Sequence, residues 1–155
     1  MRLTAFTDYT LRTLIYLALQ PGRLATIADI ADSYGISANH LMKVVHQLGV
    51  AGDVETVRGQ RGGMRLARSP AAINLGTVVR RTEPDMEIVP CFGAPAVCAI
   101  QPSCVLRHAL HEAMQAFLAV LDRYTLADLA GPQRALAGLL AIEPPAIAPE
   151  RGVPA

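Results

Sequence analysis

The sequence predicts a mostly α-helical fold with a small β-wing, in which a winged helix-turn-helix domain is followed by one long helix. Three observations predict it. Two short amphipathic segments are joined by a tight turn at Gly35, as in a helix-turn-helix. A glycine-rich hairpin follows at residues 53–68, and this order is typical of a winged helix. After Cys104 an apolar stripe at helical spacing continues for about five to six turns.

Size and composition agree with packed helices. The 155 residues are 52% hydrophobic but only 5% aromatic, and Trp is absent. Leu, Ala and Val must therefore supply the core, which suits helices better than a β-sandwich. The N-terminal segment lacks the apolar run of a signal peptide, and no apolar stretch approaches the length of a membrane helix. We therefore expect a cytoplasmic protein of one domain, or of one domain with an added dimerisation arm, whose thiols stay reduced.

Charge is unevenly distributed, although the net charge is only +1. Residues 1–68 contain eight Lys or Arg against five Asp or Glu, a net charge of +3, whereas residues 69–155 contain six against eight, a net charge of −2. The basic excess concentrates within residues 39–68. A local basic surface suits a phosphate backbone, and an ordinary solvated face is the alternative.

The first helix is expected over residues 7–19, with Thr7 as its cap. Asp8 lies in its first turn, where the helix dipole favours a carboxylate, and Arg12 lies four residues later, where the two side chains can pair. From these residues alone, Asp8 is a helix-stabilising residue. The predicted core-facing positions are Leu11, Leu14, Ile15 and Ala18.

The helix-turn-helix begins at a predicted capping box, Thr26 to Asp29. Ser37 is expected to cap the second helix and Gly49 to end it. The predicted core positions of this helix are Leu41, Val44, Val45 and Leu48. In this motif the second helix enters the major groove. Its outward side chains can all donate hydrogen bonds, and none is acidic; they are Ser37, Asn39, His40, Lys43 and Gln47.

The wing is predicted from two short alternating strands, residues 53–58 and 64–68, around a turn at 59–63 that contains three glycines. Glycines permit positive φ and close backbone approach. Arg58 and Arg61 would project from the base and the tip of the wing toward a minor groove or phosphates. Helix-turn-helix, wing and basic excess together predict binding to double-stranded DNA.

The C-terminal half predicts helices at residues 74–83 and 133–142, a short helix opening at Thr125, and the long helix between them. The stripe of the long helix needs a partner surface, which a two-fold homodimer supplies most simply; packing on the chain's own head is the alternative. The stripe consists of Leu106, Leu110, Ala113, Met114, Phe117, Val120, Leu121 and Tyr124. The predicted divisions are a winged-helix DNA-binding domain (1–83), a cysteine loop (84–104), a dimerisation helix with C-terminal helices (105–142) and a disordered tail (143–155).

All the cysteines lie in one loop, as Cys91, Cys98 and Cys104 with the spacing C-x6-C-x5-C. Three thiols on an irregular loop can converge on an iron–sulfur cluster, a zinc ion or a redox-active thiol cluster. The spacings are wider than those of zinc knuckles, and His108 and His111 are nearby candidates for a fourth ligand. We favour an iron–sulfur cluster, with zinc and a thiol switch as alternatives. No C-x-x-C pair or nucleophile-and-base set is present, so we expect no enzymatic activity.

The sequence resembles the winged-helix iron–sulfur regulators, the family to which IscR, RirA and NsrR belong. The resemblance is carried by the opening from Met1 to Ala18, by the wing stretch from Val57 to Gly63, by the cysteine loop, and by residues 124–129 after the long helix. IscR-type proteins have a histidine three residues after the last cysteine, where this chain has Arg107. This difference favours the nitric-oxide-sensing NsrR branch.

The resemblance implies roles for individual residues. Cys91, Cys98 and Cys104 match the cluster ligands, and Asp8 matches a carboxylate that reaches the cluster from the partner subunit as the fourth ligand. This replaces the helix-stabilising interpretation of Asp8, and Arg12 would then steady that carboxylate. Asn39, Lys43 and Arg58 match DNA contacts in the family, and the pattern adds Ser37, His40 and Arg61.

The implied function is a homodimeric transcriptional repressor that binds an operator in double-stranded DNA and senses nitric oxide through one iron–sulfur cluster per subunit. A 4Fe–4S cluster is expected in preference to 2Fe–2S, although three cysteines do not define the nuclearity. Nitrosylation or loss of the cluster is expected to release the operator. The rival functions are a regulator of the same fold that senses iron or iron–sulfur supply, and an iron–sulfur carrier or electron-transfer protein.

Overall fold

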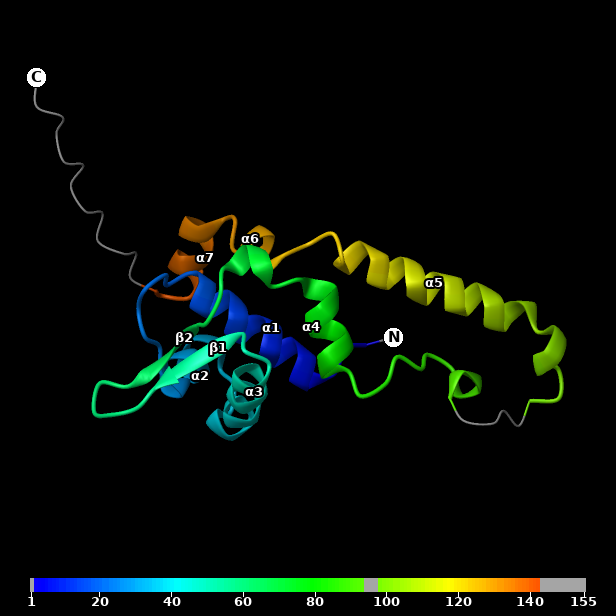
Figure 1. Ribbon diagram of the computed structural model, residues 1–155, viewed down its shortest axis with the longest axis horizontal. Coiled ribbons are helices and arrows are strands. Elements are labelled where there is room, and N and C mark those ends of the chain that lie inside the picture. Colours follow the sequence, from blue (N-terminus) through cyan, green and yellow to red (C-terminus); the bar gives the residue numbers. More distant parts are fainter. Residues whose placement is uncertain (1, 94–97, 143–155) are drawn as a thin grey trace, which may run out of the picture.

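The computed structural model describes residues 2–93 and 98–142. A head of short helices and a two-stranded sheet occupies one end of the molecule, and one long helix extends from it as an arm (Figure 1). The predicted mostly α-helical winged fold is therefore confirmed. The elements are α1 (Ala5–Ala18), α2 (Ile27–Tyr34), α3 (Ala38–Val50), β1 (Val54–Val57), β2 (Gly63–Leu66), η1 (Pro70–Ala72), α4 (Leu75–Thr82), η2 (Pro90–Phe92), η3 (Gln101–Ser103), α5 (Val105–Leu121), α6 (Leu126–Leu129) and α7 (Gln133–Leu139).

Helix α1 begins earlier than the sequence predicted. Thr4, not Thr7, is its N-cap, and the Thr4 hydroxyl accepts a hydrogen bond of 3.2 Å from the Thr7 backbone N–H. The Thr4 backbone N–H and hydroxyl also donate to Glu83 Oε1, at 2.9 and 3.1 Å. The start of α1 is therefore fixed to the segment that leads from α4 toward the cysteine loop.

The buried face of α1 also differs from the prediction. Thr7, Thr10 and Thr13 are buried together with Leu14. The Thr10 and Thr13 hydroxyls each donate a 2.8 Å hydrogen bond to a carbonyl one turn earlier, so these polar groups are satisfied within the helix. The other predicted core positions, Leu11, Ile15 and Ala18, are only partly buried beside the core.

Helices α2 and α3 form the predicted helix-turn-helix. The capping box of α2 is present, because the Thr26 hydroxyl accepts from the Asp29 N–H at 3.2 Å and Asp29 Oδ2 accepts from the Thr26 N–H at 2.7 Å. Gly35 ends α2 in the left-handed conformation, at φ 63°, which glycine adopts without strain. The four predicted core positions of α3, Leu41, Val44, Val45 and Leu48, are all buried.

Both predicted ends of α3 need correction. Ser37 occupies the N-cap position, but its hydroxyl makes no capping hydrogen bond. At the other end, α3 continues through Gly49 to Val50, and the chain turns only at Gly52, where φ is 72°. A glycine at a helical position is tolerated at a modest cost, so Gly49 does not end the helix.

The wing is the antiparallel pair β1 and β2. Its register places Val54 opposite Leu66 and Val57 opposite Gly63. The predicted hairpin is confirmed, although each strand is shorter than predicted. The turn contains Gly59 at φ 120°, a backbone conformation that side chains with a Cβ rarely adopt.

Helix α4 packs beside α1 and is capped by Asn74, whose Oδ1 accepts from the Thr77 N–H at 3.0 Å. Its apolar residues Leu75, Val78 and Val79 are buried. At its last turn, the buried Thr82 hydroxyl accepts a 2.8 Å hydrogen bond from the Thr7 hydroxyl of α1. The two helices are therefore joined by a buried polar contact as well as by apolar packing.

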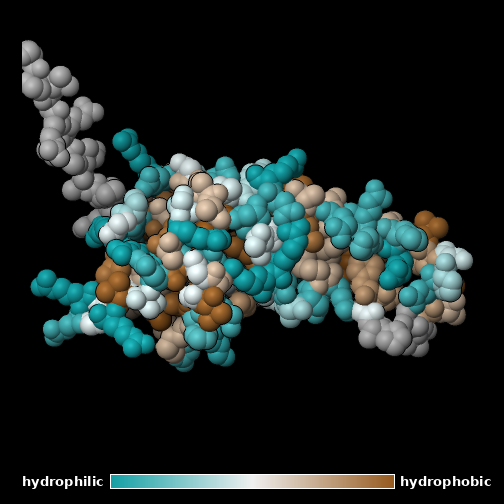
Figure 2. Space-filling model, in the orientation of Figure 1, coloured by the Kyte–Doolittle hydropathy of each residue, from teal (hydrophilic) through white to brown (hydrophobic). Residues whose placement is uncertain are grey.

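Helix α5 forms the arm and projects beyond the head (Figure 1). Within this helix, only Met114 and Leu118 are buried. Leu106, Val120 and Tyr124 of the predicted stripe are 64%, 43% and 46% exposed, and apolar surface is visible along the arm in Figure 2. Packing on the chain's own head therefore covers only part of the stripe.

The C-terminal helices return to the head. Helix α6 begins after Thr125 as predicted. The Thr125 N–H and hydroxyl both donate to Asp128 Oδ2 at 2.7 Å, and the Leu126 N–H donates to the Ile73 carbonyl at 2.9 Å. Helix α7 ends at Leu139, before the predicted residue 142. The predicted disordered tail, 143–155, lies outside the described residues. No helix in residues 2–93 and 98–142 combines the length and hydropathy needed to cross a bilayer.

Candidate cluster loop and nucleic-acid interface

The described parts of the cysteine loop, residues 84–93 and 98–104, run from the head to the far end of the arm (Figure 1). Cys91 lies in the short turn η2, and Cys104 is the N-cap residue of α5. The Cys104 sulfur accepts a hydrogen bond of 3.4 Å from the Arg107 backbone N–H. All three cysteines are free thiols. A helix N-terminus favours negative charge, which suits a thiolate ligand at Cys104.

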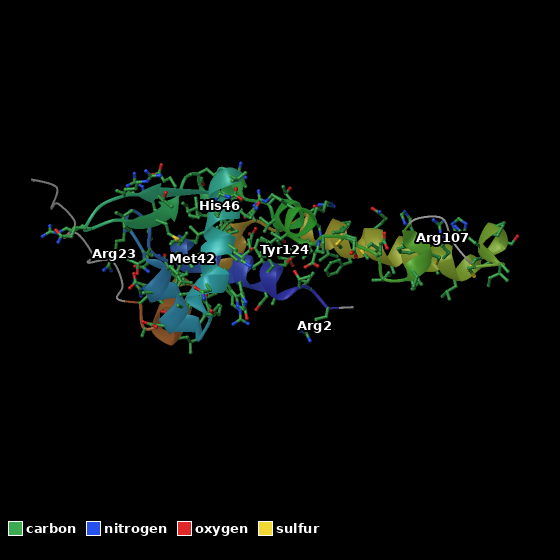
Figure 3. All side chains as sticks on the ribbon, turned by 90° about the horizontal axis from the view of Figure 1, so that it is seen from below. Arg2, Arg23, Met42, His46, Arg107 and Tyr124 are labelled. Atoms are coloured by element: carbon green, nitrogen blue, oxygen red, sulfur yellow. The ribbon has the colours of Figure 1, made fainter. Side chains whose placement is uncertain are left out.

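Arg107 joins the two ends of this loop. Its Nε donates to the Cys91 carbonyl at 3.2 Å, and its guanidinium lies 6.0 Å from the centre of the Phe92 ring. The same ring meets His111 edge-on, with 6.0 Å between centroids. Figure 3 shows Arg107 on the arm. The sequence had singled out Arg107 only as a departure from a family pattern, and the structure gives it a bridging position.

The predicted ligands are not gathered at one point in the single chain. Among the residues that the structure describes, no three Cys, His, Asp or Glu side chains lie close enough to share a metal ion. Cys98 is exposed, and residues 94–97 before it are outside the described part of the chain. The donor set fits an iron–sulfur cluster by its chemistry, because free thiols are the usual ligands of such clusters. The same donors also suit zinc.

Asp8 lies on the first turn of α1 and is connected to the helix-turn-helix. The Arg12 Nε donates to the Asp8 carboxylate at 3.0 Å, and the Arg12 guanidinium lies 5.6 Å from the centre of the Tyr34 ring, at the end of α2. Burial raises the pKa of the Tyr34 hydroxyl, and the charge of Arg12 partly offsets this shift. Beside Asp8, the Tyr9 ring lies 6.0 Å from the His40 ring of α3.

The residues predicted to face DNA are exposed, as the prediction requires. They are Ser37, Asn39, His40 and Lys43 around the start of α3, and Arg58 and Arg61 of the wing. Lys43, Arg58 and Arg61 take part in no ion pair within residues 2–93 and 98–142. Their charges are therefore available to an external anion. Two further exposed side chains of α3, Met42 and His46, are labelled in Figure 3.

Sequence reasoning missed a buried carboxylate behind the wing. Asp53 is fully buried and pairs with Arg68, at 3.0 Å, and with Arg81 of α4. On the wing itself, Arg65 pairs with Glu55. The basic excess counted from the sequence is therefore partly neutralised within the protein. The pairing of residues 53 and 81 gives no local pattern, so only a three-dimensional structure could reveal it.

These features define a class of protein: a winged helix-turn-helix with a basic reading face, carried beside a helical arm that bears a cysteine loop, is a DNA-binding regulator. Residues 3–132 match the model of the Rrf2 family, described as an iron-dependent transcriptional regulator. The chain belongs to the Rrf2 family of transcriptional regulators.

Two curated relatives illustrate the similarity. The chain is 56% identical over 131 residues to the HTH-type transcriptional regulator NsrR of Bacillus subtilis strain 168, covering 83% of this chain and 90% of that protein. It is 47% identical over 146 residues to the regulator of the same name from Halalkalibacterium halodurans, covering 93% of this chain and all of that protein.

Solved structures show the same fold. The global cysteine regulator CymR of B. subtilis matches with a TM-score of 0.69 and 28% identity, over 84% of this chain and 97% of that chain. IscR of T. potens matches with a TM-score of 0.68 and 26% identity, over 84% of this chain and 87% of that chain.

Proposed function

We propose that this chain is a cytoplasmic, homodimeric repressor of transcription that releases its operator when nitric oxide reaches an iron–sulfur cluster. The identity of 47–56% with regulators named NsrR is the observation that carries the proposal. The exposed start of α3 supports the DNA-binding part, as do Arg58 and Arg61, which form no ion pair in the described part of the chain. The loop of three free thiols supports the sensing part.

In this proposal Cys91, Cys98 and Cys104 hold the cluster together with Asp8 of the partner subunit. A 4Fe–4S cluster is favoured over 2Fe–2S, and it would supply iron that reacts with nitric oxide. Asp8 lies on α1 in the head rather than at the arm tip (Figure 1), so a second copy is the natural source of the fourth ligand. A carboxylate binds iron less tightly than a thiolate does, so Asp8 would be the most weakly held of the four ligands.

The contacts of Asp8 explain how its position could influence DNA binding. When it is not a ligand, the carboxylate accepts from Arg12, as in the structure. Arg12 contacts Tyr34 at the end of α2, so its position bears on the helix-turn-helix. Engaging Asp8 in the partner's cluster would fix the spacing of the two recognition helices. A coupling of about 3 kcal/mol between the two states would change operator occupancy by roughly 100-fold.

The arm supplies the dimer interface in this proposal. The exposed side of α5 carries apolar residues at helical spacing, including Leu106, Ala113 and Val120. Pairing of two arms by a two-fold axis would cover this face in both copies. It would also place each cysteine loop near the other subunit.

Anaerobically purified protein tests the proposal. Its absorption near roughly 400 nm, with iron and sulfide analysis, should show a bound cluster, and nitric oxide should bleach or shift that absorption. Gel-shift titration should then show strong operator binding by the cluster-loaded protein and weaker binding by the nitrosylated and cluster-free forms. Equal affinity of all three forms would reject the proposal. A colourless, iron-free preparation would favour zinc or bare thiols.

A regulator that senses iron is the second candidate function, and the family description as iron-dependent favours it. Iron chelation without nitric oxide would release DNA from such a protein, whereas our proposal requires release by nitric oxide at constant iron supply. An iron–sulfur carrier has no need of Arg58, so the Arg58→Ala variant would retain its activity.

A further inference from the structure

The chain carries a buried negative charge next to its recognition helix. Asp53 lies between α3 and β1, immediately before Val54, and is fully buried. Arg68 Nη2 lies 3.0 Å from Asp53 Oδ1, and Arg81 Nη2 contacts Asp53 Oδ2. The Arg68 contact is an ion pair without the alignment of a hydrogen bond, so Oδ1 has no hydrogen-bond donor among the described residues. A buried carboxylate is costly unless cations compensate it, and two arginines do so here.

The guanidinium of Arg81 contacts the Asp53 carboxylate on one side and is exposed to solvent on the other. It lies in the last turn of α4, and its side chain is 34% exposed. A guanidinium has five N–H donors in a planar fork. Asp53 is the acceptor that the structure records for Arg81 within residues 2–93 and 98–142. Donors therefore remain for a second anion on the exposed side, and the contact with Asp53 limits the orientation of the fork.

The exposed side of Arg81 borders an open groove of about 630 Å³ beside α3. The groove is lined by Phe6, Met42, Lys43, His46, Gln47 and Arg81. No carboxylate is in this lining, whereas two cations and two further possible hydrogen-bond donors are. Lys43 belongs both to this groove and to the predicted DNA-reading face. Met42 and His46 can be followed along α3 in Figure 3. The groove is thus continuous with the reading face.

We propose that Arg81 is a phosphate-binding residue of the DNA interface and that Asp53 positions it. Each protomer would place one backbone phosphate of a DNA duplex in the groove between α3 and the end of α4, bound by Arg81. Arg–phosphate pairs of this kind are strong because the planar fork matches the phosphate oxygens. The inference rests on the proposed DNA-binding function and adds a contact from α4, outside the helix-turn-helix and the wing.

Arg80 provides a matched control. It precedes Arg81 in α4 and is also exposed and ion-paired, but its partner is Asp122 at the end of α5. Arg80 does not line the groove beside α3. Arg80→Gln and Arg81→Gln remove the same charge from adjacent residues and break one ion pair each. A difference in DNA binding between the two variants therefore reflects the position of the arginine and not the net charge of the protein.

The test is the salt dependence of binding to a mixed-sequence DNA duplex, measured with anaerobically purified protein. The logarithm of the binding constant falls linearly with the logarithm of salt concentration, with a slope of about −0.9 for each phosphate that the protein neutralises. Arg81→Gln should reduce the size of this slope by about 1 per protomer, roughly 2 per dimer. Arg80→Gln should leave the slope unchanged. An unchanged slope in Arg81→Gln, or an equal reduction in both variants, would overturn the inference.

Two more variants separate phosphate binding from a structural role. Arg81→Gln leaves Asp53 with Arg68 as its ion-pair partner, and the double variant Arg81→Gln/Asp53→Asn also removes the buried carboxylate and should show the same reduced slope. Arg81→Lys retains a positive charge and should recover most of the slope. A double variant with the wild-type slope would mean that Arg81 acts only through Asp53. Failure of the wild-type protein to bind any duplex would instead reject the proposed function itself.

Discussion

Arg80 holds Asp122 through two hydrogen bonds, at 2.6 Å from Nη1 to Oδ1 and 2.7 Å from Nη2 to Oδ2. This pair joins α4 of the head to the residue that ends α5. The Asn74 side chain reinforces the junction by donating to the Asp122 carbonyl at 2.7 Å. Gly76 leaves room for it, because a Cβ at that position would lie 1.9 Å from Asp122 Oδ1. The arm is therefore attached to the head by a defined polar junction.

The junction predicts a pH-dependent contribution to stability. The hydrogen bonds from Arg80 lower the pKa of Asp122 below its ordinary value of 3.8. A carboxyl group whose pKa is lower in the folded state stabilises the fold above its unfolded pKa, and this contribution is lost as the pH falls through the folded pKa. Asp122→Asn should therefore lower the melting temperature slightly at neutral pH, and the difference from wild type should shrink below pH 3.8.

Thermal unfolding of both proteins across this pH range measures the effect. Because the pair is exposed, salt should also reduce the difference at neutral pH. A difference in melting temperature that stays constant from neutral to acidic pH would show that the pair contributes through something other than its charge.

The proposed dimer interface on α5 predicts that one substitution in this helix should disrupt the dimer. Ala113 lies on the exposed apolar face of α5 between Leu106 and Val120. Ala113→Glu places a charge at the centre of the proposed two-fold interface, so the protein should become monomeric at micromolar concentration. Gln115→Glu introduces the same side chain at an exposed position on the other side of the helix and should leave the dimer intact. Analytical ultracentrifugation distinguishes the two, and a dimer in both variants would place the interface elsewhere.

The exposed position of Arg58 on the wing predicts that the Arg58→Ala variant binds DNA less tightly. Arg58 is exposed and has no ion-pair partner in the described part of the chain, so its charge is available to DNA. Removing it should cost about 1–3 kcal/mol of operator binding, roughly 5- to 150-fold in the dissociation constant. Gln60→Ala, in the same exposed turn, should change affinity much less. Fluorescence anisotropy with an operator duplex measures the dissociation constants of both variants. Equal losses of affinity in the two variants would show that Arg58 does not contact DNA.

Asp8 and the cysteines predict different phenotypes. Cys98→Ala should prevent stable cluster binding, and the purified protein should lack stoichiometric iron and sulfide. Asp8→Asn leaves the three thiols in place, so it should retain a cluster with an altered absorption spectrum and bind operator no better than the cluster-free protein. Asp32→Asn, at another exposed carboxylate of the head, should behave as wild type. A wild-type spectrum and operator affinity in Asp8→Asn would exclude Asp8 as a ligand.

Local patterns in the sequence predicted local structure well. The capping box at Thr26, the helix start at Thr125 and the buried face of α3 are all present. Each depends on side chains within one or two helical turns, which spacing along the chain reports directly. The glycine-rich wing was predictable for the same reason, because Gly59 adopts a backbone conformation that other residues avoid.

Features that depend on distant contacts were not predictable. Thr4 begins α1 because it both caps the helix and reaches Glu83, whereas Thr7 is buried against Thr82. Nothing near these threonines in the sequence distinguishes the two roles. The pairing of Asp53 with Arg81 joins residues 28 positions apart, so counting charges overestimated the free basic surface. In the proposed function the arrangement of the cluster ligands depends on a second copy, which no pattern within one chain describes.

Helix α5 connects a cysteine of the loop to the polar junction with the head, so a movement at one end affects the other. Cys104 stands immediately before its first residue, and Asp122, immediately after its last, is clasped by Arg80. Seventeen helical residues span about 25 Å, so a tilt of roughly 5° would carry one end about 2 Å sideways. A displacement of Cys104 would therefore be carried along the helix axis to the Arg80–Asp122 pair without passing through the core of the head.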